Sequence, residues 1–318
     1  MAPPGSGRGH RGTATPGADG VSVAAPLVHD DAVTLLASAL EGWTPGPLTH
    51  TAVVTPGPAA AFAALLDQPA PPLADGDPLP PGWHVLTVLD RPATADLGED
   101  GHPRNGHFLP PVPHRRRMIA GGRLSVTAPL RIGAAVERTS SLAGCSVREG
   151  RSGPMLLVTV RSEYRQDGAL LVSEEQDVVY RSQRAGAAAA PAGAGSPAVE
   201  GGPAVELLPD EALLFRFSAL TYNAHRIHYD RPYATGVEGH PGLVVHGPLL
   251  ALLMLEVVRR SAPDRSVTAF EHRLVRPTYA GTAVRAAGRF DGGRVELSAG
   301  AVGAPASATG TVSLGPVA

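Results

Sequence analysis

Apolar residues fall on every side of a helix over the segment from Gly247 to Arg260. Both ends carry helix signals, because Gly247 suits the cap, Pro248 suits the first helical position, and the final arginines are favoured by the helix dipole. Pro263 then stops the helix. A helix that is apolar all round is enclosed by other elements, so we expect this one to be wrapped in sheet.

Segments with strand character lie on both sides of this helix, separated by glycine-containing breaks. The candidates before it are Ile119 to Pro129, Val136 to Arg148, Met155 to Tyr164 and Leu170 to Tyr180. The candidates after it are Ser266 to Arg276, Ala283 to Phe290, Arg294 to Ala301 and Ala306 to Leu314. Short helices are predicted at Asp31 to Leu40 and Ala59 to Leu66, with a Pro/Gly-rich loop between them around Trp43.

The two groups of strands share a local signature at one constant offset. It consists of Pro129, Gly133 and Val136 in APLRIGAAV, and of Pro277, Gly281 and Val284 in RPTYAGTAV. A repeat of this length indicates a duplicated domain. We therefore expect an α+β protein with similar units at 31–184 and 205–318. The Ala/Gly/Pro-rich stretch 185–204 is predicted to be a linker, and 1–30 a disordered leader.

The composition excludes several classes of protein. The 318 residues carry 27 basic and 29 acidic side chains, a balance without the basic footprint of a nucleic-acid-binding protein. The single cysteine, Cys145, excludes an internal disulfide and indicates a reducing compartment. No apolar run approaches the length of a membrane span, and the leader is broken by Pro26. We expect a cytoplasmic protein without membrane contact.

A polar cluster precedes the apolar helix, and its members are Asn223, His225, Arg226, His228, Tyr229 and Asp230. A histidine suits general acid–base chemistry because its ordinary pKa lies near working pH. Zinc is the alternative, with ligands from the set His225, His228, Asp230, His240 and His246. No cysteine stands nearby, so we expect no metal.

The cluster also carries a resemblance to a known family. NAHRIHYD, PYAT and PGLVVHGPLL resemble the C-terminal half of mesaconyl-C4-CoA hydratase-like proteins, a MaoC-related family of type 2 hydroxyacyl-thioester dehydratases. LGEDGHP, FLPPVP, RRMIAGGRL, GRSGPM and EEQDVVYR resemble its N-terminal half. The resemblance covers the chain from about Trp43 onward. It implies a double hot-dog, with two antiparallel sheets that each wrap a central helix and pack as an intrachain pseudo-dimer.

The resemblance also implies a reaction, the reversible hydration of a 2-enoyl thioester. MaoC-type hydratases carry the pattern D-x-N-P-x-H, in which Asn223 here replaces the acid, His225 the asparagine and Arg226 the proline, while His228 is retained. An amide orients water but does not titrate. We expect His228 to be the base toward a water held by Asn223, and the Gly247 N–H to stabilise the thioester oxygen.

Four further residues are predicted to bind substrate: His225, Arg226, Tyr229 and His246. Each has a structural alternative, because His225 and Arg226 can tie the loop to the sheet, Tyr229 can brace it, and His246 can pack or cap. Arg226 is the cation expected to bind the carboxylate of a dicarboxylic acyl group. The N-terminal half lacks an equivalent cluster, so we expect it to complete the pocket without doing chemistry.

The substrate class stays open at several points. The acyl group is expected to be small and branched or dicarboxylic, such as mesaconyl, carried on coenzyme A or on an acyl carrier protein, and no other cofactor is implied. With no lysine in the chain, arginines must contact phosphates, and Arg115, Arg116 and Arg117 form the densest group. The alternatives are an acyl-CoA thioesterase and a non-catalytic acyl-thioester-binding protein. Symmetric homo-oligomerisation is expected without a specified order.

Overall fold

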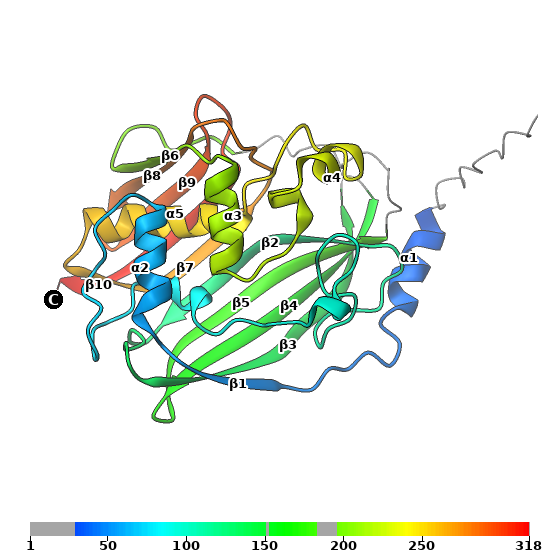
Figure 1. Cartoon of the computed structure of the whole chain (residues 1–318), viewed down its shortest axis with the longest axis horizontal. Coiled ribbons are helices and arrows are strands. Elements are labelled where there is room, and N and C mark those ends of the chain that lie inside the picture. Colours follow the sequence, from blue (N-terminus) through cyan, green and yellow to red (C-terminus); the bar gives the residue numbers. More distant parts are fainter. Residues whose placement is uncertain (1–28, 151–152, 183–195, 318) are drawn as a thin grey trace, which may run out of the picture.

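The computed structural model of the chain describes residues 29–150, 153–182 and 196–317 (Figure 1). The first half of the sequence supplies the strands β1 (Leu48–Val53), β2 (Arg115–Val126), β3 (Ala135–Gly150), β4 (Gly153–Gln166) and β5 (Ala169–Ser182). The second half supplies β6 (Ala204–Leu207), β7 (Arg265–Leu274), β8 (Val284–Asp291), β9 (Arg294–Ala301) and β10 (Ala308–Val317). They form one sheet in the order β1-β3-β4-β5-β2-β7-β10-β9-β8-β6, and every pairing is antiparallel.

The two halves of the sheet meet where β2 pairs with β7. Gly121 to Ser125 of β2 lie opposite Arg273 to Ala269 of β7. A Cβ on Gly121 would stand 2.2 Å from the carbonyl oxygen of His272, so glycine is required for this close approach. The sheet is therefore continuous across the duplication, and the double hot-dog prediction is confirmed.

All eight predicted strands are present, with ends shifted by a few residues. The predicted short helices are α1 (His29–Ser38) and α2 (Pro56–Leu65). The sequence reading missed β1 and β6, which are the two outermost strands of the sheet. β1 alternates between half-buried and exposed residues, and β6 is four residues long, so neither contains an apolar run.

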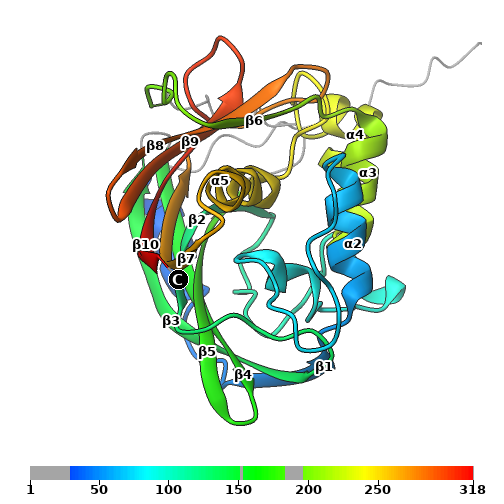
Figure 2. The same cartoon turned by 90° about the vertical axis from the view of Figure 1, so that its left-hand side faces the viewer.

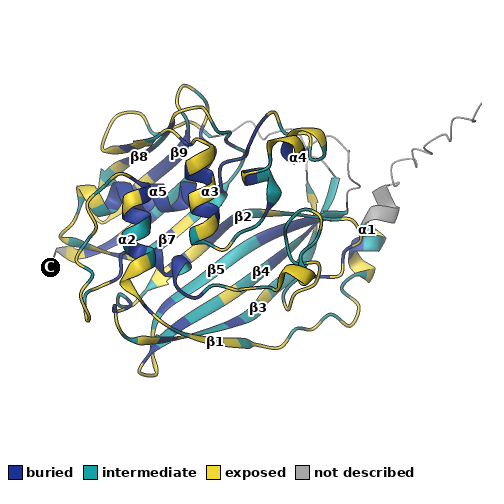
Figure 3. Ribbon diagram, in the orientation of Figure 1, coloured by how far each residue is buried: buried dark blue, intermediate teal, exposed yellow. Residues whose placement is uncertain are grey.

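The apolar helix is α5 (Gly247–Ser261), and all ten residues from Leu249 to Val258 are buried. It packs against β6, β8, β9 and β10, inside the curve of the C-terminal half (Figures 2 and 3). Two details differ from the prediction. His246 rather than Gly247 is the N-cap, and the helix carries a buried carboxylate, Glu256.

The Glu256 carboxylate binds residues of the N-terminal half. It accepts hydrogen bonds from Trp83 Nε1 at 3.0 Å and from Gln68 Nε2 at 2.9 Å, and it pairs with Arg259 on its own helix. A buried charge is tolerated when it is bonded in this way. The carboxylate thus joins the two halves from inside the core.

The N-terminal half is filled differently. No helix as long as α5 belongs to its described residues. Its inner face instead packs the 3₁₀ turn η1 (Trp83–Leu86), where the His84 and Tyr164 rings lie 4.7 Å apart. The helix α2 packs on α3 (Glu211–Leu220) beside it (Figure 2). The central helix expected in each half is therefore present in full only in the second.

The predicted leader and linker fall largely outside the described residues, which exclude 1–28 and 183–195. The described end of the linker already contacts the C-terminal half, because Ser196 forms a bridge with Ala306 and the Val199 N–H donates to Ser298 Oγ. Among the described helices, none combines the length and the hydropathy that crossing a membrane requires.

Candidate active site

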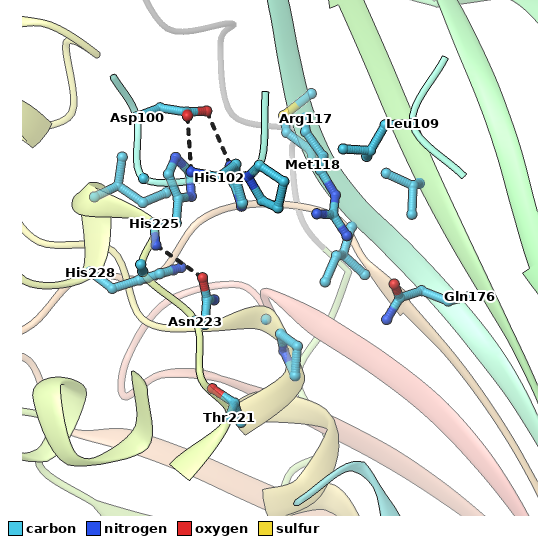
Figure 4. A pocket seen from close by; sticks show the side chains of 18 of the residues that line it. Asp100, His102, Leu109, Arg117, Met118, Gln176, Thr221, Asn223, His225 and His228 are labelled. Carbon is cyan, nitrogen blue, oxygen red and sulfur yellow. Dashed lines mark hydrogen bonds and ion pairs between the residues drawn. The ribbon is translucent and has the colours of Figure 1, made fainter. Parts of the chain in front are cut away.

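A cavity of about 1870 Å³ is lined by residues of both halves (Figure 4). The N-terminal half contributes Asp100, His102, Leu109, Arg117 and Gln176 to its wall, among others. The C-terminal half contributes Thr221, Asn223, His225, His228 and Gly247, among others. Both halves of the chain are therefore needed to enclose this space.

The polar cluster sits on a loop that is held by local hydrogen bonds. α3 ends at Leu220, and Tyr222 turns the chain with a φ of 51°. The Oδ1 atom of Asn223 accepts the main-chain N–H of His225 at 3.0 Å, and the turn η3 (Arg226–His228) follows. Asp230 then caps the short helix α4 (Arg231–Gly236). A loop bonded in this way presents its side chains in one geometry.

His228 has one nitrogen fixed and one available. Its Nδ1 lies 2.7 Å from the carbonyl oxygen of Val244. A carbonyl only accepts, so Nδ1 carries the proton and Nε2 keeps the lone pair of a base. Burial, together with the neighbouring His246 and His225 rings, holds the pKa of His228 well below its usual value. The ring is therefore neutral at neutral pH and able to accept a proton.

The two ends of the Asn223 amide have different surroundings, one in the loop and one in the cavity. Its Oδ1 is used by the His225 N–H, so the NH₂ group is the end that can donate to a water or a substrate oxygen. The side chain lines the cavity beside His228 (Figure 4). This arrangement fits the positioning of water and offers no titratable group.

Gly247 is the first residue of α5 and also lines the cavity. Helix N-termini present N–H groups that lack intrahelical acceptors, and the next residue, Pro248, has no N–H. A Cβ on Gly247 would stand 2.4 Å from Leu274 Cδ1, so any side chain here would displace Leu274. The Gly247 N–H is thus the donor that this helix end offers to the cavity.

Two residues that sequence reasoning did not select, Asp100 and His102, belong to the same site. The Asp100 carboxylate lies 3.1 Å from His102 Nδ1 and accepts the His102 main-chain N–H at 3.0 Å. The His102 and His225 rings are 4.0 Å apart. Burial lowers the pKa of His102 to about 4, an effect only partly opposed by Asp100. Both residues lie in the LGEDGHP block, which was noted in the sequence, but the block by itself does not indicate that it contacts His225.

The loop that carries these residues docks on the polar cluster through its backbone. The Asp100 carbonyl accepts the Arg226 N–H at 2.9 Å. Gly101 has a φ of +85°, and a Cβ there would lie 1.8 Å from the Ala224 carbonyl oxygen. Only glycine meets both conditions, so Gly101 marks the contact between the two halves of the site.

The potential metal ligands that lie close together in the structure differ from the set considered in the sequence analysis. Ligand atoms of Asp100, His102 and His225 lie within 4.8 Å of one another. The centres of the His102 and His225 rings lie 4.0 Å apart, and the ring planes are tilted by 34°. Because an imidazole binds a metal in the plane of its ring, this arrangement suits ring packing better than coordination of one ion. Asp230, from the earlier set, is bound to Arg226.

The predicted substrate-binding residues divide into two groups. His225 lines the cavity, with its Nε2 3.6 Å from Glu238. Tyr229 also lines it, although its hydroxyl donates to the Ala224 carbonyl and braces the loop. His246 is not part of the wall; its Nε2 lies 2.9 Å from Ser218 Oγ, and its ring stacks on His228 at 3.6 Å.

Arg226 does not stand where the sequence reading put it. Its guanidinium binds Asp230 at 2.7 and 2.9 Å, donates to the Glu99 carbonyl at 3.0 Å, and lies 4.0 Å from the centre of the Tyr233 ring. It is not among the residues that line the cavity. A guanidinium engaged in this way ties the loop together, which is the structural alternative for this residue.

Comparison with known proteins identifies the family of this chain. The family model of hydroxyacyl-thioester dehydratase type 2 matches residues 82–280. The mesaconyl-C(4)-CoA hydratase of Chloroflexus aurantiacus is 44% identical over 258 residues, which are 81% of this chain and 91% of that protein.

Solved structures share the fold at low sequence identity. A MaoC-like dehydratase from Phytophthora capsici matches with a TM-score of 0.64 and 13% identity over 86% of this chain and 97% of that one. A Mycobacterium tuberculosis protein with a double hot-dog fold matches with a TM-score of 0.50 and 13% identity over 86% and 96%. From the family match and the C. aurantiacus relative, the chain belongs to the hydroxyacyl-thioester dehydratase type 2 family and is a hydratase or dehydratase of a CoA thioester.

Proposed function

We propose that the protein catalyses the reversible hydration of a branched, dicarboxylic 2-enoyl-CoA thioester of the mesaconyl-C4 type. The observation that carries the chemistry is the His228 imidazole, which is fixed by the Val244 carbonyl and lines the same cavity as the Asn223 amide and Gly247. The choice of acyl group is supported by the 44% identity to the C. aurantiacus enzyme named for that substrate.

In the hydration direction, the Asn223 NH₂ group orients a water and Nε2 of His228 takes one of its protons. The water oxygen bonds to the β-carbon, and the electrons of the double bond move toward the α-carbon and the thioester oxygen. The protonated His228 then returns the proton to the α-carbon. Dehydration runs through the same steps in reverse, so one residue acts as base and then as acid.

The intermediate places negative charge on the thioester oxygen. The Gly247 N–H at the start of α5 donates to this oxygen in the proposed mechanism, aided by the helix dipole. Donors that are already in place need no reorganisation during the reaction, which is why a fixed helix end is effective. No metal takes part in the proposed steps, so turnover should persist after treatment with a chelator.

The thioesterase alternative requires a base or nucleophile directed at the thioester carbonyl carbon. Carboxylates do line the cavity, among them Asp100, which pairs with His102, Glu238, which pairs with Arg116, and the half-buried Glu174. The Oε2 atom of Glu174 lies 3.2 Å from His84 Nε2 and 3.5 Å from the Tyr164 hydroxyl, so it belongs to a bonded network within the N-terminal half. Hydration therefore accounts better for the residues of the polar cluster.

The test is a panel of enoyl-CoA esters followed by two signals in parallel. Loss of enoyl thioester absorbance without release of thiol is expected for mesaconyl-C4-CoA. Release of free CoA at the same rate as the loss of thioester would make the protein a thioesterase. If no ester of the panel gave either signal, the protein would be an acyl-thioester-binding protein, and the proposal would be overturned.

A further inference from the structure

Three consecutive arginines begin β2, and the structure treats them differently. Arg115 donates to the carbonyl oxygens of Pro110, Pro103 and Arg104. Arg116 forms an ion pair with Glu238 at 3.3 Å. The side chain of Arg117 forms no hydrogen bond or ion pair with any residue that the structure describes. Two guanidinium groups are thus used by the protein itself, and the third is left for another partner.

Arg117 points into the cavity. It is half-buried and lines the wall, and Figure 4 shows its side chain between His102 and Gln176. Its charge is close enough to His102 to lower the pKa of that ring. A half-buried cation without a counter-charge is unfavourable, and an anionic ligand removes this cost when it binds.

The position of Arg117 decides which anion of a CoA ester it can meet. Its neighbour His102 lies 4.0 Å from His225, whose ring is 5.5 Å from that of His228. In the proposed mechanism the reacting carbons of the substrate lie beside His228, so these ring-centre distances place Arg117 beside the same side chains as those carbons. The phosphates of CoA are separated from the thioester by the whole pantetheine arm. An arginine beside these histidines therefore faces the acyl group.

We infer that Arg117 binds the free carboxylate of the acyl chain and so determines the preference for dicarboxylic thioesters. In a mesaconyl-C4 thioester this carboxylate is attached to the β-carbon, the carbon that water attacks. Arg117 lies across the cavity from His228 and Asn223 (Figure 4). A carboxylate held there by a two-pronged guanidinium turns the β-carbon toward the water. The part of this inference that concerns turnover rests on the proposed function. The role replaces the one predicted for Arg226.

The first experiment compares mesaconyl-C4-CoA with 3-methylcrotonyl-CoA, which has a methyl group in place of the carboxylate. Arg117→Gln should lower kcat/KM for the charged ester by roughly 10- to 100-fold, the effect of a lost charged hydrogen bond, and leave the neutral ester nearly unchanged. Arg123→Gln is the matched control, because Arg123 lies on the same strand outside the cavity wall and pairs with Glu175 and Asp177.

Equal losses on both esters would overturn the inference, because they would assign Arg117 to the thioester oxygen or to CoA. A selective loss in Arg276→Gln with Arg117→Gln unaffected would also overturn it, since Arg276 is another cation of the cavity wall. Arg226→Gln should reduce both turnovers alike, because its guanidinium braces the loop that carries His228.

The second experiment needs no turnover. Succinyl-CoA and butyryl-CoA differ by a carboxylate against a methyl group on the β-carbon, and neither can be hydrated. Calorimetry should show a preference for succinyl-CoA that Arg117→Gln removes. An unchanged preference in that variant sinks the carboxylate site whatever reaction the protein catalyses. If the protein preferred succinyl-CoA but showed no hydratase activity, the proposed function would be contradicted and the carboxylate site would stand.

Discussion

The two halves of the sheet share a short sequence signature and are filled in different ways. In the C-terminal half, strands of eight to ten residues beside α5 close around the fifteen residues of that helix. In the N-terminal half, β2 to β5 run for 12 to 16 residues, and the four-residue turn η1 packs on the inner face. The difference teaches that a cavity lined by both halves forms where one half lacks a long central helix.

The proposed chemistry follows the same division. The C-terminal half carries the base, the amide and the helix end, all within one loop and the start of α5. The N-terminal half carries Asp100, His102 and Arg117, which line the same cavity. In this view one half performs the reaction and the other selects the substrate.

The largest expected effect removes the base from the reacting half. His228→Ala should lower kcat by about 10²- to 10⁴-fold, the usual contribution of general acid–base catalysis. The measurement is steady-state hydration with mesaconyl-C4-CoA, with unfolding curves to verify that the variant is folded. A fully active His228→Ala enzyme would transfer the role of base to His225 and weaken the division between the halves.

A smaller effect is expected at the contact between the halves. Gly101→Ala introduces a Cβ 1.8 Å from the Ala224 carbonyl in a backbone with positive φ, so the two loops must separate. We expect a loss of about 1–3 kcal/mol in the free energy of unfolding, with reduced turnover of both charged and neutral esters.

Gly144→Ala is the control for this prediction, because a Cβ at Gly144 in β3 meets no atom within 4 Å. Denaturant unfolding and kcat/KM measure the two variants together. If Gly101→Ala were as stable and as active as the control, the docking of the Asp100 loop would not be needed to build the site.

The smallest effect concerns the pH profile. The pKa of His228 is held well below 6.5 by burial and by the His246 and His225 rings. A base works in its neutral form, so kcat/KM should be constant at neutral pH and fall only when the pH drops well below 6.5. Asn223→Asp adds a negative charge beside the ring, which should raise the pKa of His228 and move the falling limb of the profile to higher pH. An unmoved limb would mean that another group titrates.

The sequence predicted the elements whose signal is local. The strands β2 to β5 and β7 to β10, and the helix α5, follow from runs of apolar residues bounded by glycine and proline. The edge strands β1 and β6 were missed because an edge strand needs no such run. The burial of the Glu256 carboxylate could not be predicted, because its partners Trp83 and Gln68 lie far away in the sequence, in the other half of the chain.

The candidate site divides along the same line. Asn223 and His228 could be selected from the sequence because they are close neighbours on one loop and match a family pattern, and Gly247 because helix starts have a local signature. Asp100 and His102 could not, since what makes them part of the site is a contact with His225 across the duplication.

Only the tertiary structure decided between arginines. Arg226 and Arg117 are equally cationic in the sequence, and Arg226 stands nearer to His228 along the chain. Folding gives Arg226 the Asp230 carboxylate as its partner and leaves Arg117 facing the cavity. The sequence therefore determined which chemical groups are present and where the strands and the central helix form. Which groups are free to meet a ligand depends on contacts between residues distant in sequence, and these exist only once the two halves have packed.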